Sequence, residues 1–77
     1  MAFSIEIERE ELTTTGDCRF IAEIAALPGV MAYGLSEKDA VAKTEALALR
    51  VIAERIEHGE PTPEIEIDSL FRIGKAA

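Results

Sequence analysis

Residues 36–59 contain the feature that most limits what this chain can fold into, an amphipathic helix with a defined beginning and end. Ser36 stands three residues before Asp39, the spacing of a capping box with Asp in place of the usual Glu or Gln. Gly59 follows His58 and predicts the end of the helix, because glycine readily adopts the left-handed conformation that closes one. Small or apolar residues share one broad arc of this helix: Ala40, Val41, Thr44, Leu47, Ala48, Val51, Ile52 and Ile56. The chain therefore needs a second layer that covers the arc.

Alternating apolar and polar residues before the helix predict three short strands, because a period of two puts one face of a strand in the core. The first strand is expected over residues 3–9, and residues 10–17 are expected to form a hairpin loop. Residues 19–25 predict the second strand, which stops at the Leu-Pro-Gly turn 27–29 because proline cannot donate to a strand ladder. Residues 30–33 predict a short third strand.

Residues after the helix predict a fourth strand. A stiff Pro-Thr-Pro connector at 61–63 leads into residues 64–68, where isoleucines alternate with acidic residues. The helix must carry the chain across the sheet, so this strand is expected beside the first and parallel to it. The predicted fold is α+β with the order β-β-β-α-β, in a single domain over residues 1–77.

The balance of charge limits the possible partners. The formal net charge is −7, from 15 acidic and 8 basic residues. Such a chain repels phosphate backbones, so we expect no direct binding to nucleic acid, and a basic protein is the better electrostatic match.

The small size of the chain favours self-association. A domain of 77 residues has a marginal core, and the single cysteine, Cys18, allows no intrachain disulfide. We therefore expect a homo-oligomer, most simply a homodimer. Carboxylates interrupt the N-terminal segment from Glu6 onward, and no apolar run approaches the roughly 20 residues that span a bilayer. The predicted location is the cytoplasm, without membrane contact.

Carboxylates on the strands form a predicted acidic face. Glu6 and Glu8 share one side of the first strand, and Glu64 and Glu66 share one side of the fourth. If the two strands are neighbours, these side chains gather on the sheet face opposite the helix. Three interpretations fit: a solvated face, a surface that attracts a basic partner, or paired carboxylates that bind metal ions in a hydrolase.

A possible apolar contact lies on the second and third strands. Ile21 points away from the side that holds Phe20, and Met31 and Tyr33 share one side of the third strand. Met31 and Tyr33 either complete the core or join Ile21 in an exposed patch. Because a small monomer avoids large exposed apolar patches, the second arrangement predicts that Ile21, Met31 and Tyr33 form a homodimer or partner interface.

The residues with reactive side chains predict structural roles. His58 stands at the expected C-terminal end of the helix, where its charge suits the helix dipole. Ser36 is explained by helix capping, and Cys18 has no adjacent base in the sequence that would activate a thiol. We therefore predict a protein that is not an enzyme and that has neither a cofactor nor a metal site.

Several short motifs together resemble a known family. The segment Leu27-Pro28-Gly29-Val30, then Gly34, then Ser36-Glu37-Lys38-Asp39-Ala40, is similar to the signature of HicB-like domains. Residues 59–63 resemble the Gly/Pro-rich exit from the helix in that family, and the likeness extends over about residues 3–68. The resemblance implies a β-β-β-α-β, partial RNase H-like fold. It also implies an antitoxin that masks a small basic HicA-type toxin, an mRNA interferase with a double-stranded-RNA-binding-like fold.

The resemblance leaves other functions open. Members of the family usually carry a separate DNA-binding segment, whereas only nine residues follow Asp68, too few for a helix-turn-helix or a ribbon-helix-helix. We therefore expect no such segment here. The alternatives are a stand-alone structural or regulatory HicB-like protein without a toxin partner, and a degenerate metal-dependent RNase H-like hydrolase.

Overall fold

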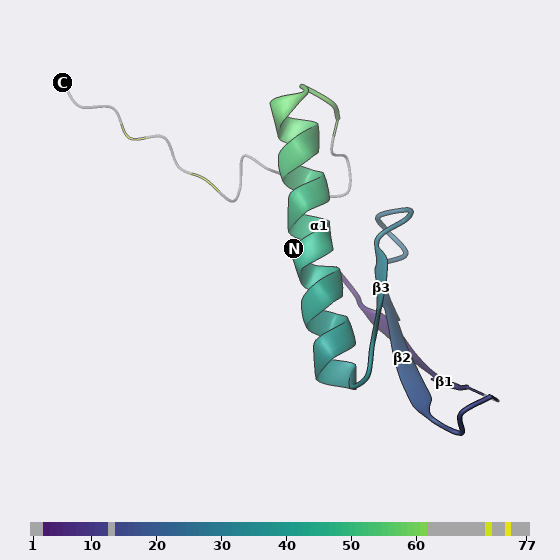
Figure 1. Cartoon of the computed structure of the whole chain (residues 1–77). Helices are drawn as coiled ribbons and strands as arrows, with labels where there is room; N and C mark the ends of the chain where they lie inside the picture. The colour runs from purple at the N-terminus through teal and green to yellow at the C-terminus, as the bar shows by residue number, and fades with distance from the viewer. Residues whose placement is uncertain (1–2, 13, 62–70, 72–73, 75–77) are drawn as a thin grey trace.

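The described part of the chain is an α+β fold in which one helix covers one face of an antiparallel sheet (Figure 1). The computed structural model describes residues 3–12, 14–61, 71 and 74. The elements follow one another as β1 (Glu6–Glu11), β2 (Cys18–Glu23), β3 (Met31–Gly34) and α1 (Glu37–Glu57). The sheet has the order β1-β2-β3, as the predicted meander requires. The predicted fourth strand at 64–68 lies outside the described residues.

The first hairpin differs from the prediction in its boundaries. β1 starts and ends later than the expected strand 3–9, and residues that were assigned to the loop pair with β2, up to Glu11 opposite Cys18. The ladder continues past the alternating segment because Glu10 stands opposite Arg19, whose guanidinium binds its carboxylate. Leu12 then closes the shorter loop by donating its N–H to the carbonyl of Asp17 at 2.7 Å.

Both ends of α1 have the predicted caps. The Ser36 hydroxyl accepts a hydrogen bond from the Asp39 N–H at 3.1 Å, which satisfies one of the free donors of the first turn. Gly59 adopts a φ of 66° after the cap residue His58. The Glu60 N–H returns to the Arg55 carbonyl at 2.8 Å, as in a Schellman motif.

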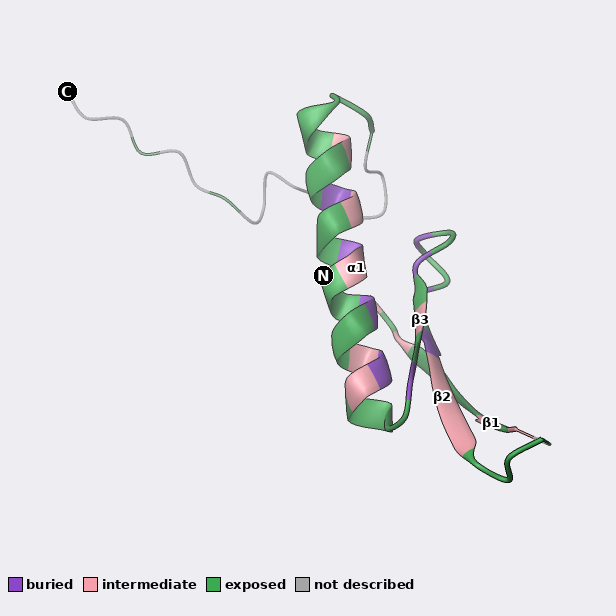
Figure 2. Cartoon of the chain, in the orientation of Figure 1, coloured by how far each residue is buried: buried purple, intermediate pink, exposed green. Residues whose placement is uncertain are grey.

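The core lies between the middle of α1 and the β2–β3 half of the sheet (Figure 2). The helix buries residues that recur every four positions: Ala40, Thr44, Ala48 and Ile52. Of these, Ala48 and Ile52 pack in one cluster with Ile24, Leu27 and Val30, which come from the connection between β2 and β3. Leu27 is completely buried, so the Leu-Pro-Gly segment supplies core volume as well as a turn.

Gly34 allows the close passage from β3 into the helix. A Cβ atom at this position would lie 2.5 Å from the Ala40 backbone nitrogen and 2.7 Å from Asp39 Oδ2. No ordinary contact is that short, so the end of β3 reaches the first turn of α1 because residue 34 has no side chain.

The helix does not bury all of its predicted arc. Ile56 is 46% exposed, because it stands in the last turn, beyond the core residues Ala48 and Ile52. Ile7, on the helix side of β1, is 40% exposed, because the helix packs on β2 and β3. Among the described residues, no helix is both long enough and apolar enough to span a membrane.

Candidate protein-binding face

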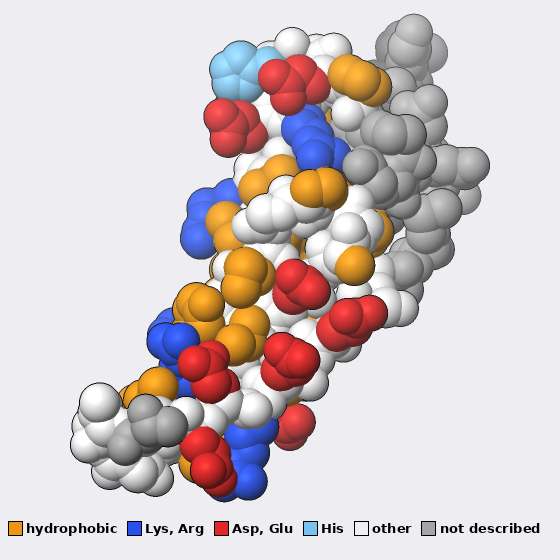
Figure 3. Space-filling model, turned by 90° about the vertical axis from the view of Figure 1, so that its right-hand side faces the viewer, with side chains coloured by type: hydrophobic (Ala, Val, Ile, Leu, Met, Phe, Trp, Pro, Cys, Tyr) orange, Lys and Arg blue, Asp and Glu red, His pale blue; other side chains and the backbone are white. Residues whose placement is uncertain are grey.

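The sheet has a second face, turned away from α1, which we call the outer face. Strand register fixes which side chains share it, since directly paired residues point to the same side. Its members form three rows across the strands: Glu6–Glu23–Met31, Glu8–Ile21–Tyr33 and Glu10–Arg19. Hydrophobic side chains run along this side of the molecule, with acidic side chains on one flank (Figure 3).

The register decides between the two orientations that remained open for β3. Tyr33 pairs with Ile21 and Met31 pairs with Glu23, so both lie on the outer face. Met31 is 37% exposed and Tyr33 is 45% exposed, and the interpretation that they complete the core is therefore wrong. Ala32 and Gly34 occupy the helix side of β3, and at Gly34 the first turn of α1 leaves no room for a side chain. That Ile21, Met31 and Tyr33 contact a partner stays a prediction.

At one end of the outer face, which we call the closed end, the charge of a carboxylate is neutralised by an arginine of the same face. The Arg19 guanidinium donates hydrogen bonds to both carboxylate oxygens of Glu10, at distances of 3.1–3.3 Å. Its Cζ atom also lies 4.3 Å from the centroid of the Tyr33 ring, within cation–π range. A single cation thus occupies both the carboxylate of Glu10 and the aromatic face of Tyr33.

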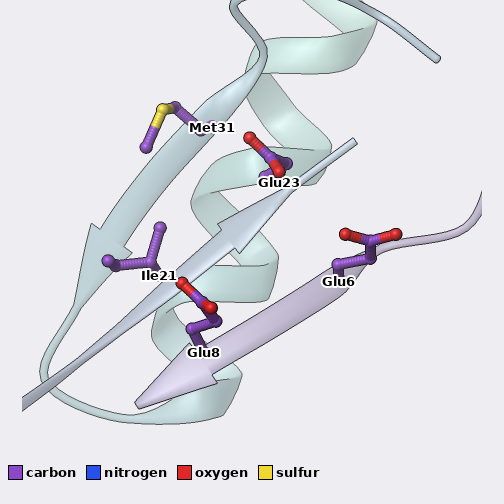
Figure 4. A pocket seen from close by; sticks show the side chains of 5 residues that line it. All are labelled: Glu6, Glu8, Ile21, Glu23 and Met31. Atoms are coloured by element: carbon purple, nitrogen blue, oxygen red, sulfur yellow. The ribbon is translucent and has the colours of Figure 1, made fainter. Parts of the chain in front are cut away.

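The other end, which we call the open end, is anionic. Glu6 and Glu23 stand directly opposite each other, an arrangement that destabilises a strand pair. With Glu8 they line one side of a pocket of 210 Å³, and Ile21 and Met31 line its other side (Figure 4). No described residue forms an ion pair or a hydrogen bond with the carboxylates of Glu6, Glu8 or Glu23.

The predicted acidic face is thus described only in part. Glu6 and Glu8 lie together on the outer face, whereas Glu64 and Glu66 lie outside the described residues. Glu23 joins the first pair, although the sequence did not single it out. Its spacing of two from Ile21 places it on the same side of β2, but only the register brings it opposite Glu6.

A second concave region lies on the helix side of the sheet. This groove of 330 Å³ is lined by residues from the chain start, the end of β2 and the flank of α1: Phe3, Ile5, Ile24, Glu45, Ala48, Leu49 and Ile52. Leu49 is 68% exposed there, outside the predicted apolar arc. The groove is apolar apart from Glu45, and no reactive side chain lines it.

The residues with reactive side chains have local structural contacts. Cys18 Sγ accepts a hydrogen bond from Arg9 Nη2 at 2.9 Å, and this bond, with the nearby Glu11, raises the pKa of Arg9. His58 Nδ1 lies 2.8 Å from the Glu54 carbonyl oxygen in the last turn of α1. Within the described part of the chain, no three His, Cys, Asp or Glu side chains gather closely enough to hold a metal ion.

Comparison with known proteins identifies no relative of this chain. Neither the protein-family models, nor the curated proteins, nor the solved structures contain a match to the chain. The outer face of the sheet is the candidate functional site on the strength of its own geometry.

Proposed function

We propose that this chain is a non-enzymatic, HicB-like protein-binding domain that acts as an antitoxin by masking a small basic HicA-type mRNA interferase. The observation that carries the proposal is the outer face, where carboxylates that pair with no cation among the described residues stand beside exposed apolar side chains. The likeness of the Leu27–Ala40 motifs to the HicB signature supplies the identity of the expected partner.

The two kinds of side chain on the outer face have different tasks in this proposal. The carboxylates of Glu6, Glu8 and Glu23 attract a basic surface and orient its approach, which mainly raises the rate of association. The apolar side chains of Ile21 and Met31 then supply surface that is removed from water in the complex. A basic surface covered in this way is no longer accessible to RNA.

A second copy of the chain is the other candidate for this face. Ile21, Met31 and Tyr33 supply the apolar patch that a homodimer would bury. Two copies, however, each have a formal net charge of −7, and this like charge opposes their association. A basic partner is therefore favoured over a homodimer at this face, and light scattering of the purified chain and of Ile21→Glu separates the two. A dimer that Ile21→Glu dissociates would support self-association through the patch.

The proposal is tested with a small basic toxin encoded beside the gene of this chain. We expect the purified chain to bind that toxin and to stop its cleavage of RNA in vitro, and we expect Ile21→Glu to abolish both effects. Leu49→Glu, on the other side of the sheet, is the matched control and should leave both effects intact. Binding that survives Ile21→Glu but not Leu49→Glu would contradict the proposed surface. An isolated gene with no such neighbour would favour the stand-alone alternative.

A further inference from the structure

We propose that the open end of the outer face receives one lysine or arginine side chain of a partner protein. This inference rests on the proposed function and deepens it, because it names the group that the partner must present. It also assigns unequal roles to the two ends of the face.

The division of the face follows from the position of Arg19. Its guanidinium already occupies the Glu10 carboxylate and the Tyr33 ring. An incoming cation would meet a like charge there, so the closed end does not receive it. The carboxylates of Glu6, Glu8 and Glu23 remain, at the open end of the same sheet face.

The open end matches the two parts of a long basic side chain. Lysine and arginine have an apolar stem and a charged head, and they bury the stem along apolar surface while the head finds an anionic or wet site. Here Ile21 and Met31 supply an apolar floor on one side of the pocket, and the carboxylates stand on its other side (Figure 4). A cation among them would also relieve the repulsion between Glu6 and Glu23, which stand directly opposite each other.

A bare metal ion fits this place less well than an organic cation. The acidic side chains of the described residues form no group of three that could ligate one ion. A basic side chain needs no such convergence, because its head can be shared among separated carboxylates, and its stem uses the apolar floor that an ion cannot use.

Titration by NMR of the ¹⁵N-labelled full chain tests the inference with the peptide acetyl-Ala-Lys-Ala-Lys-Ala-amide as the probe. The matched control is the same peptide with both lysines acetylated, in buffer that contains a chelator. We expect the unmodified peptide to shift the backbone amide signals of Ile21, Glu23 and Met31, and the acetylated peptide to leave them in place. Equal shifts with both peptides, or shifts centred on Leu49 in the helix-side groove, would overturn the inference.

Single substitutions locate the site within the chain. We expect Glu23→Gln and Glu6→Gln each to weaken binding of the lysine peptide by about two- to fivefold, the range of an exposed ion pair. Glu57→Gln, in the last turn of α1, makes the same change in net charge and should leave binding unchanged. An equal loss in Glu57→Gln would show attraction by overall charge only, which would overturn the inference. The dispersion of the NMR signals verifies that each variant is folded.

The inference and the proposed function can fail separately. If the toxin binds Glu23→Gln and the parent chain with equal affinity while Ile21→Glu abolishes binding, the lysine site is wrong and the protein-binding face remains. If the lysine peptide binds at the open end and the toxin does not bind at all, the antitoxin proposal is wrong and the side-chain preference remains.

Discussion

The hydroxyl of Thr44, in the middle of α1, donates a hydrogen bond of 3.0 Å to the backbone carbonyl of Ala22 in the central strand β2. Both residues are completely buried. The bond joins the two layers of the fold at a position where the helix and sheet otherwise meet through small apolar side chains. It ties the rotation of α1 to the position of β2, and with it the orientation of the two sheet faces.

Replacement of Thr44 tests the contribution of this bond. Thr44→Val keeps the shape of the side chain but removes the donor, and we expect the free energy of unfolding to fall by about 1–2 kcal/mol. Urea denaturation followed by circular dichroism measures the change. Thr44→Ser is the control that retains the hydroxyl and loses a methyl group. A Val variant as stable as the parent chain would show that the bond contributes nothing.

Gly34 gives a second prediction. The Cβ atom of Gly34→Ala would meet the backbone of Ala40 at 2.5 Å, so β3 and the first turn of α1 must separate. We expect a loss of about 1–3 kcal/mol in the free energy of unfolding, the range of overpacked sites. Gly74→Ala has no heavy atom within 4 Å of the added carbon and serves as the control in the same denaturation experiment. Equal stabilities of the two variants would refute the steric explanation.

Leu27 and Leu49 form a matched pair for the core. Leu27 is 0% exposed in the turn before β3, whereas Leu49 is 68% exposed on α1. Leu27→Ala is expected to lower the free energy of unfolding by about 2–5 kcal/mol, because it removes buried methyl groups and leaves a cavity. Leu49→Ala should change it by less than about 1 kcal/mol. Thermal and urea melts of both variants measure the difference, and a larger effect at Leu49 would place the core elsewhere.

Removal of Arg19 should change the preference of the outer face. Arg19→Gln releases the Glu10 carboxylate and the Tyr33 ring, so a lysine peptide should bind about two- to fivefold more tightly at low salt. The gain should shrink as salt rises to 150 mM, where exposed charges are screened over about 8 Å.

The control for Arg19→Gln is Lys43→Gln. It makes the same change in net charge but breaks the ion pair of Lys43 with Asp39 on α1 instead. Isothermal titration with the lysine peptide compares the two variants. An equal gain in both would mean that net charge alone sets the affinity.

Local sequence signals predicted much of this fold. Helix α1 was predicted from its cap at Ser36, its stop at Gly59 and the four-residue spacing of Ala40, Thr44, Ala48 and Ile52. These signals are local, because capping and helical periodicity depend on residues within a few positions of one another. The antiparallel order of β1, β2 and β3 followed from the turn residues between short alternating segments. The end of β1 was misplaced, because Glu10 and Glu11 join the ladder through their partners on β2 and show no alternation of their own.

Which residues make up the outer face depends on the tertiary structure. A period of two shows that Met31 and Tyr33 share a side, but it does not say which side the helix covers. That choice depends on Gly34, which admits the first turn of α1 to one side of β3 and leaves the large side chains on the other. The pairing of Glu6 with Glu23 likewise depends on the register of the hairpin, since the two residues are distant in sequence and only the ladder brings them together.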